Sequence, residues 1–137
     1  MTKSALADSI AALAWKYFDA IEHGDIQGVV DCCVDEARLW HNTDGKEMSL
    51  ADQVAALRDL GAHYPERRFR DRRVATFDGG FVQQYTFWAQ HLDGHVIQFP
   101  VCVVGRVRDG RIERLDEYLD PTPLAAPAPA PAPVGPA

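Results

Sequence analysis

The chain has 137 residues, of which 47% are hydrophobic and 25% charged, which suits one globular domain and is too short for two. Its formal net charge of -6 at pH 7 argues against a general nucleic-acid-binding protein, because such proteins need basic side chains to neutralise phosphates. No apolar run approaches the roughly 20 residues that cross a bilayer, and the N-terminus lacks the pattern of a secretory signal. We therefore expect a cytoplasmic protein with no membrane association.

Cysteine and histidine content gives no reason to expect a metal or a cofactor. The 3 cysteines include the adjacent pair Cys32 and Cys33 and do not make a disulfide framework, so we expect reduced, mostly buried thiols. We expect no metal site among the 5 histidines, which are His23, His41, His63, His91 and His95.

The first part of the chain predicts helices. Apolar residues recur at three- and four-residue steps between Ser4 and His23, and Gly24 can supply the left-handed residue that often ends a helix. Asp25 is suited to cap a short second helix. A strand is expected over residues 37–42, and residues 42–45, Asn-Thr-Asp-Gly, are typical of a turn.

A third helix is expected after this turn. Ser49 is a typical N-cap residue, and Asp52 stands where a capping-box partner would be. Gly61 is predicted to end the helix. The apolar residues that would form its buried stripe are Leu50, Val54 and Leu57.

The second part of the chain predicts strands, because the hydrophobic period changes to two after Tyr64 and Pro65. Glycine-containing turns divide it into strands over 68–77, 81–91, 96–107 and 111–120. Pro100 is expected at a bulge or an edge position, because proline cannot donate to a sheet ladder. Three helices followed by an antiparallel meander indicate an α+β fold over residues 1–121. Residues 122–137, rich in alanine and proline, are expected to be a largely disordered spacer.

Three features of the segment from Ser4 to Pro121 go together: Tyr17 before Gly24, the Asp-Glu-Ala entry (35–37) to the first strand, and the closing strand from Gly110. With these features and its elements in this order, the chain resembles the nuclear transport factor 2-like superfamily. Members include ketosteroid isomerase, limonene epoxide hydrolase and the SnoaL-like polyketide cyclases. The resemblance implies a cone-shaped roll of helices on a strongly bent sheet, an internal pocket and a homodimer. Because this fold hosts many activities, it does not define the reaction.

Individual roles follow from the comparison with ketosteroid isomerase. That enzyme has a first-helix tyrosine that donates to the substrate oxyanion, and Tyr17 matches its spacing. Its general base, an aspartate near the end of the first strand, corresponds to His41. Its second oxyanion donor falls on Cys102, whose thiol is a weak donor. This departure argues against a true ketosteroid isomerase.

Of the three catalytic residues of the epoxide hydrolases, this chain keeps only one carboxylate. Their arginine and aspartate on the second meander strand fall on Gln84 and Thr86, and the aspartate of the last strand falls on Glu117. Epoxide hydrolysis is therefore not expected.

The implied register would place further side chains on the pocket wall. A mostly apolar wall with a few polar groups is typical of a site for a hydrophobic small molecule. Phe99 and Trp15 would lie nearby as wall or core. The expected substrate-binding residues are Trp40, Gln84, Thr86, Trp88, Gln98, Cys102, Leu115 and Leu119.

The three residues matched to catalytic positions of the family suggest acid–base chemistry. His41 is the best candidate base, because an imidazole exchanges protons near neutral pH. Glu117 could orient it or act as the partner acid, and Tyr17 could donate to an enolate oxygen. The hypothesis is proton abstraction next to a carbonyl, giving isomerisation, dehydration or cyclisation without a cofactor.

Plainer interpretations stay open for the same residues. Tyr17 could be a core tyrosine, His41 a solvent-facing turn residue and Glu117 a surface carboxylate. The chain would then be a non-catalytic ligand-binding module or a dimeric adaptor. The arginine-rich segment 67–73 is interpreted as a solvated face or a partner contact.

Overall fold

The first helix, α1 (Lys3–His23), is capped at both ends, at its C-terminus by Gly24 as predicted and at its N-terminus by Thr2, which was not anticipated from the sequence. We describe a computed structural model covering residues 2–122, so the predicted spacer lies, apart from Thr122, outside the described residues. The Thr2 hydroxyl accepts the Ala5 N–H at 3.0 Å. Gly24 adopts a φ of 71°, and its N–H bonds the carbonyls of the last helical turn. None of the helices within residues 2–122 has both the length and the apolar character needed to span a membrane.

Asp25 caps the short helix α2 (Ile26–Asp31) as predicted, accepting the Gly28 N–H at 2.9 Å. The next strand, β1 (Cys33–His41), begins earlier than expected, because residues 33 and 34 are already buried and extended. A three-residue strand, β2 (Glu47–Ser49), was not anticipated by the sequence pattern. It pairs antiparallel with β1, which accounts for its extended backbone.

Helix α3 (Leu50–His63) has the full predicted capping box: Ser49 accepts the Asp52 N–H, and Asp52 accepts the Ser49 N–H, both at 3.1 Å. The prediction that Gly61 ends the helix is wrong. Helix α3 continues to His63, and the Tyr64 N–H still bonds the Leu60 carbonyl. Gly61 does not adopt the left-handed conformation that ends helices.

Four long strands complete the sheet and lie close to their predicted ranges. They are β3 (Glu66–Phe77), β4 (Gly80–Gln90), β5 (Val96–Arg108) and β6 (Arg111–Leu119). The sheet order is β2-β1-β6-β5-β4-β3. Only the β1–β6 pair is parallel; the remaining pairs are antiparallel. This confirms the expected α+β fold, although the sheet is open rather than closed.

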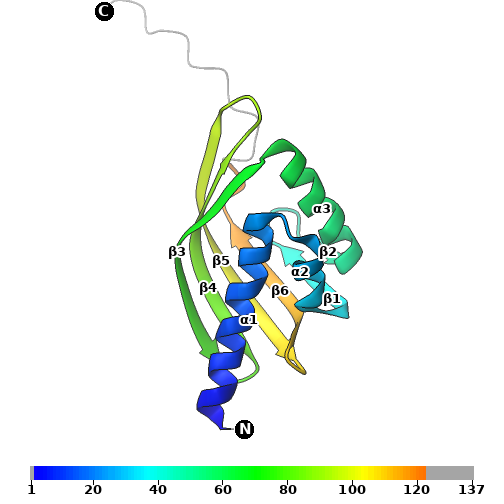
Figure 1. The fold of residues 1–137 in the computed structure, drawn as a ribbon, viewed down its shortest axis with the longest axis vertical. Coiled ribbons are helices and arrows are strands. Elements are labelled where there is room, and N and C mark those ends of the chain that lie inside the picture. Colours follow the sequence, from blue (N-terminus) through cyan, green and yellow to red (C-terminus); the bar gives the residue numbers. More distant parts are fainter. Residues whose placement is uncertain (1, 123–137) are drawn as a thin grey trace, which may run out of the picture.

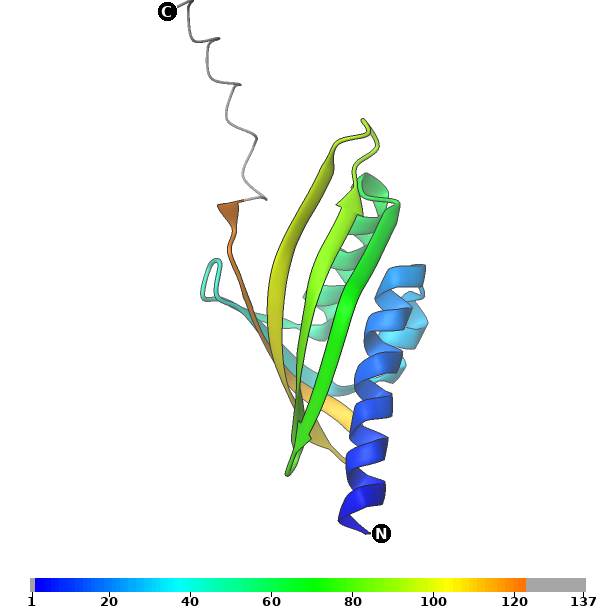
Figure 2. The same ribbon diagram turned by 90° about the vertical axis from the view of Figure 1, so that its left-hand side faces the viewer.

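The sheet is bent, and all three helices lie against one side of it (Figures 1 and 2). Pro100 sits in β5 opposite Thr86 of β4, while pairing with β6 begins only at Val101. Pro100 therefore has a neighbouring strand on one side only, which makes it a local edge position, as expected.

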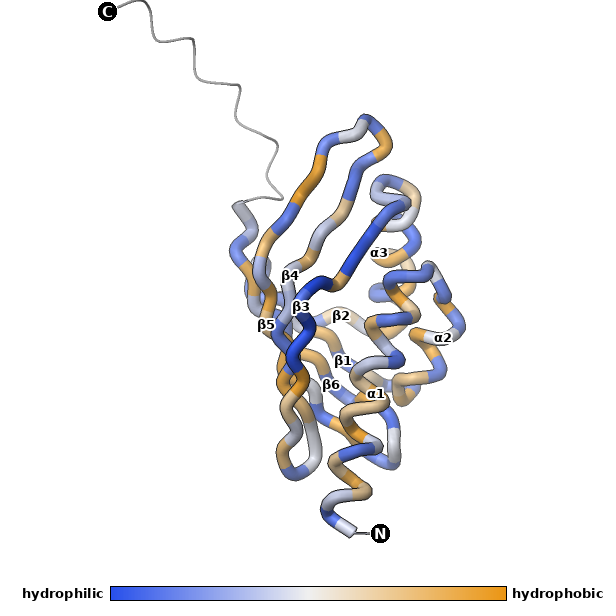
Figure 3. The backbone as a smooth tube through the Cα atoms, turned by 60° about the vertical axis from the view of Figure 1, so that its left-hand side comes forward, coloured by the Kyte–Doolittle hydropathy of each residue, from blue (hydrophilic) through white to orange (hydrophobic). Residues whose placement is uncertain are grey.

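The edge strand β3 is the most hydrophilic strand in the sheet (Figure 3). Charged residues along an edge discourage pairing with other chains. Two of its arginines nevertheless serve the fold. Arg72 forms an ion pair with Asp19 at 2.5 Å, and its guanidinium stacks 3.8 Å from the Trp15 ring centroid. Trp15 therefore lies outside the core, 43% exposed, contrary to expectation.

Arg67 is the second structural arginine and is only 5% exposed. Its Nε and Nη2 atoms donate to the Ile21 carbonyl, at 3.3 and 3.0 Å, and Nη1 donates to the Tyr64 carbonyl at 2.7 Å. The Ile21 carbonyl lies in the last turn of α1, and Tyr64 is the C-cap of α3. The helix dipoles favour positive charge at both of these C-terminal ends. Burial lowers the pKa of Arg67, as does the neighbouring charge of Arg68. One guanidinium thus joins β3 to the ends of both long helices.

Gln83 is the anomaly of the core. It is 0% exposed, and both polar atoms of its side chain lack a hydrogen-bond partner among residues 2–122. Burying an amide without partners costs about 1–3 kcal/mol. We expect Gln83→Met to raise the free energy of unfolding by about 1–2 kcal/mol, measured by urea denaturation. The matched control is Gln84→Met, an exposed neighbour, with no more than about 0.5 kcal/mol of change. A Gln83→Met protein less stable than the wild type would contradict this reading.

Candidate active site

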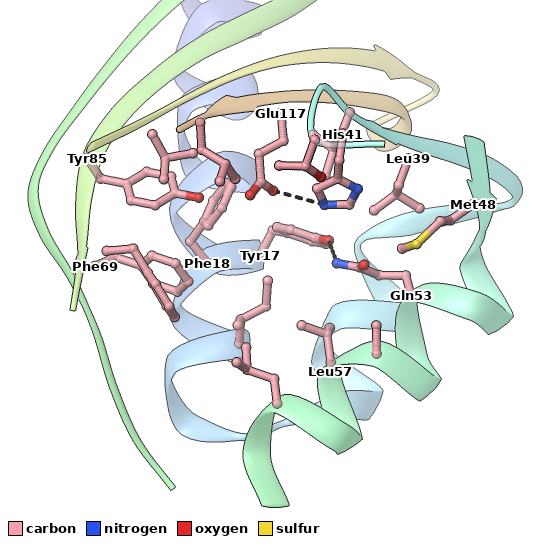
Figure 4. A pocket seen from close by; sticks show the side chains of 18 of the residues that line it. Tyr17, Phe18, Leu39, His41, Met48, Gln53, Leu57, Phe69, Tyr85 and Glu117 are labelled. Atoms are coloured by element: carbon pink, nitrogen blue, oxygen red, sulfur yellow. Dashed lines mark hydrogen bonds and ion pairs between the residues drawn. The ribbon is translucent and has the colours of Figure 1, made fainter. Parts of the chain in front are cut away.

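A cavity of about 350 Å³ lies between α1, α3 and the concave face of the sheet. This volume falls within the usual range for small-molecule sites. Figure 4 shows side chains from both helices and from several strands pointing into it. Its lining is mostly apolar: Tyr17, Phe18, Ile21, Leu39, Trp40, His41, Thr43, Met48, Gln53, Ala56, Leu57, Leu60, Phe69, Tyr85, Phe87, Phe99, Val101, Leu115, Glu117 and Leu119.

One wall of the cavity is built from packed aromatic rings. Phe69 contacts Phe18, Tyr85 and Phe87 with centroid separations of 5.2, 4.9 and 5.5 Å, and Phe87 lies 5.5 Å from Phe99. Edge-on and tilted pairs at such separations are favourable. This packed aromatic wall is suited to an apolar or aromatic ligand.

The polar end of the cavity contains His41 and Glu117. The parallel pairing of β1 with β6 places these two residues opposite each other, and Nε2 of His41 lies 3.4 Å from Oε2 of Glu117. The interaction with Glu117 raises the pKa of His41 above its usual value, and burial opposes this only in part. The pair therefore favours an imidazole that holds a proton more tightly than it would in water.

Asn42 fixes the strand ends beside this pair. Its side chain donates to the Leu119 carbonyl at 3.0 Å and accepts the Leu119 N–H at 2.9 Å, while its backbone N–H bonds the Glu117 carbonyl. The amide side chain thus continues the β1–β6 pairing by one step. We infer that Asn42 helps to position His41 and Glu117.

Tyr17 and Gln53 form a second polar pair. Nε2 of Gln53 donates to the Tyr17 hydroxyl at 3.1 Å, and the two residues are 1% and 8% exposed. Because the hydroxyl oxygen accepts from Gln53, its own proton is free to be donated into the cavity. Burial raises the pKa of Tyr17 well above its usual value, so the hydroxyl stays protonated.

The structure brings together seven of the residues that the sequence singled out. Three are the acid–base candidates and four were expected in or near the wall, and all line the cavity: Tyr17, His41, Glu117, Trp40, Phe99, Leu115 and Leu119. Their roles in catalysis and binding stay a proposal. Gln53 and Phe69 line the same cavity and were not anticipated, because nothing in the local pattern marks a helix glutamine or one aromatic residue in an arginine-rich strand as part of a pocket.

Five expected wall residues lie elsewhere, and their predicted placement was wrong. The odd-numbered residues of β4 and β5 are buried on the concave face, whereas the even-numbered residues face outward. The assumed alternation was therefore shifted by one residue, which moves every side chain to the other face. The residues placed outside the cavity are Gln84, Thr86, Trp88, Gln98 and Cys102.

Solved structures with low sequence identity share this fold. AclR, a proposed hydroxylase from Streptomyces galilaeus, is 16% identical with a TM-score of 0.77, over 86% of this chain and 79% of that chain. A proposed polyketide cyclase from Xanthomonas campestris pv. campestris is 19% identical with a TM-score of 0.76, over 85% and 93%. An LEH-like epoxide hydrolase from M. tuberculosis is 18% identical with a TM-score of 0.72, over 83% and 84%.

At such identities the likeness concerns the fold and not the reaction. A comparison with curated proteins found no match. The family model of the SnoaL-like domain matches residues 14–115, from the middle of α1 to the last strand. This range includes the aromatic wall, His41, Tyr17 and Gln53. The chain therefore belongs to the SnoaL-like domain family.

Proposed function

We propose that the protein is a cofactor-free enzyme that transfers protons on a hydrophobic carbonyl compound, as an isomerase or as a lyase of the dehydratase or cyclase type. The observation that most supports this proposal is that the His41–Glu117 pair and the Tyr17 hydroxyl face one apolar cavity (Figure 4). Structures of similar fold include proposed polyketide cyclases and an epoxide hydrolase, which supports a small-molecule substrate.

The proposed reaction begins with His41 removing a proton from the carbon next to the carbonyl. Glu117, 3.4 Å from the imidazole, stabilises the imidazolium that forms. Tyr17 donates its hydroxyl proton in a hydrogen bond to the enolate oxygen, and Gln53 holds Tyr17 in place. His41 then returns the proton to another atom of the substrate. General base catalysis contributes typically 10²- to 10⁴-fold and an oxyanion donor about 10²- to 10³-fold.

A ligand panel tests the first half of this proposal. Steroid-like, terpenoid and aromatic polyketide ketones are added to the wild type, and the melting temperature is measured. A compound that binds only the folded state adds about 2.7 kcal/mol at a hundredfold excess over its Kd. We expect the shift to disappear in Leu57→Trp, which fills the cavity, and to persist in Leu6→Trp, which changes an exposed leucine. A shift that persists in Leu57→Trp would place the ligand elsewhere and contradict the assignment.

We also propose a homodimer formed through the outer face of the sheet. Tyr118 is 46% exposed there, its ring lies 5.2 Å from that of Trp40, and Trp88 is half-buried beneath the Arg70 guanidinium at 4.8 Å. Tyrosine and tryptophan side chains are enriched at interfaces. Light scattering is expected to give twice the chain mass for the wild type and the single mass for Trp88→Glu. A wild type that is monomeric at about 100 µM, near −5.5 kcal/mol of association, contradicts the dimer.

A further inference from the structure

The β4–β5 hairpin brings two histidines together at the tip of the sheet. After the last strand pair, Gln90 with Val96, the His91 N–H bonds the His95 carbonyl at 2.8 Å, and Gly94 makes the turn with a φ of 95°. Residues directly opposite each other in antiparallel strands project to the same face. The imidazoles of His91 and His95 accordingly stack, with centroids 4.6 Å apart.

Asp93 directs its carboxylate to the same point. It accepts the His95 N–H at 2.9 Å, and its Oδ1 lies 2.5 Å from Nδ1 of His95 and 3.2 Å from Nδ1 of His91. All three potential ligand atoms lie within 4.8 Å of one another. Ligands at the usual zinc distances of about 2.0–2.2 Å stand roughly 3.3 Å apart in a tetrahedron. The Asp93 N–H donates to Nδ1 of His91 at 3.1 Å, so seating an ion takes small side-chain rotations that release this bond.

The surroundings hold these side chains in place. The Tyr64 hydroxyl lies 3.3 Å from Nε2 of His95, the nitrogen that points away from Asp93, and the Tyr64 ring packs edge-on against His91 at 5.0 Å. The Leu92 N–H bonds the His63 carbonyl at 3.0 Å, which ties the turn to the end of α3. Partners on the second nitrogen of an imidazole orient it for metal binding.

We propose that His91, Asp93 and His95 bind one late first-row divalent cation, with Zn²⁺ as the representative ion. Two imidazoles and one carboxylate suit zinc, and three protein ligands leave a fourth position for water or an outside ligand. The side chains are 25%, 61% and 43% exposed, so this position is open to solvent. None of the three residues lines the cavity, so the site is independent of the proposed reaction.

This proposal revises the expectation that no histidine binds a metal. That expectation overlooks that His91 and His95 stand four residues apart with Asp93 midway between them. In this protein the two histidines come together because they face each other across a hairpin turn. In a helix, the same four-residue spacing would place them on one face.

Calorimetric titration of Zn²⁺ into tag-free, metal-stripped protein tests the site. We expect one ion per chain, with affinity at least tenfold weaker in His91→Ala and in His95→Ala. His23→Ala, which removes an exposed histidine far along the chain from the hairpin, should bind as the wild type does. Unchanged affinity in His95→Ala, or no binding to the wild type, overturns the proposal, because zinc would then bind elsewhere or not at all.

A second readout guards against a variant that folds poorly. Zn²⁺ in excess is expected to raise the melting temperature of the wild type and of His23→Ala, and to leave that of His95→Ala unchanged. Mg²⁺ at the same concentration should have no effect, since it prefers oxygen ligands in octahedral geometry. An equal response to both cations contradicts a site built from imidazoles.

Discussion

Replacing His41 with alanine is expected to slow turnover of the substrate by about 10²- to 10⁴-fold, because it removes the proposed general base. Ligand affinity should change little, since most residues that line the cavity are apolar and are left in place. Steady-state kcat and an independently measured Kd separate the two effects. His23→Ala is the matched control, because it removes an exposed histidine in the last turn of α1.

Two outcomes would contradict the role of His41. Unaltered turnover in His41→Ala means that another group takes the proton. Complete loss of ligand binding, with turnover no longer measurable for that reason, means that His41 acts in binding and gives no support for its role as a base.

The pH dependence of the rate follows from the His41–Glu117 pair. The imidazole accepts a proton only when neutral, so kcat should rise with pH through the pKa of His41, which Glu117 and the charge of Asp44 raise above 6.5. Glu117→Gln should move this limb to lower pH. The same pair stabilises the fold fully below the unfolded-state pKa, and this contribution is lost as the pH rises through the raised pKa of the folded protein.

Replacing Arg67 with methionine is expected to lower the free energy of unfolding by about 3 kcal/mol, the largest effect on stability that we predict. Methionine keeps the apolar stem but leaves the buried carbonyls of Ile21 and Tyr64 without the guanidinium. Gly24 and Gly61 lie beside this group, since a Cβ at either position would be in van der Waals contact with the guanidinium, at 3.4 and 3.5 Å. Urea denaturation with a common m-value measures the change.

Arg73→Met is the control for Arg67, because Arg73 lies on the same strand and is exposed. It should change stability by no more than about 0.5 kcal/mol. Equal effects of the two substitutions would mean that the loss of positive charge matters and not the bonds to the helix ends.

Local signals were enough to predict most elements of the fold. Gly24, Asp25 and Ser49 each act where the sequence indicated, because a cap depends on a few neighbouring atoms. Strand β2 was missed for the opposite reason. Its three residues are extended because they pair with β1, and such a long-range cause leaves no local pattern.

The candidate site was predictable only in part. Tyr17, His41 and Glu117 line one cavity, a placement that the resemblance implied and that composition alone does not give. The faces of β4 and β5 were assigned one residue out of step, because Trp88 outside and Gln83 inside blur the alternation. Gln53 meets Tyr17 across 36 positions of the chain, a contact that no local pattern announces.

The most direct test of the account is deuterium incorporation by the wild type in D₂O. The tightest ketone from the ligand panel is incubated with a small amount of protein, and mass spectrometry follows exchange at the carbon next to the carbonyl. The account predicts exchange faster than in buffer, rising with pH through the pKa of His41 and lost in His41→Ala. A ketone that binds in the cavity yet exchanges no faster than in buffer would contradict proton transfer and identify the protein as a ligand carrier.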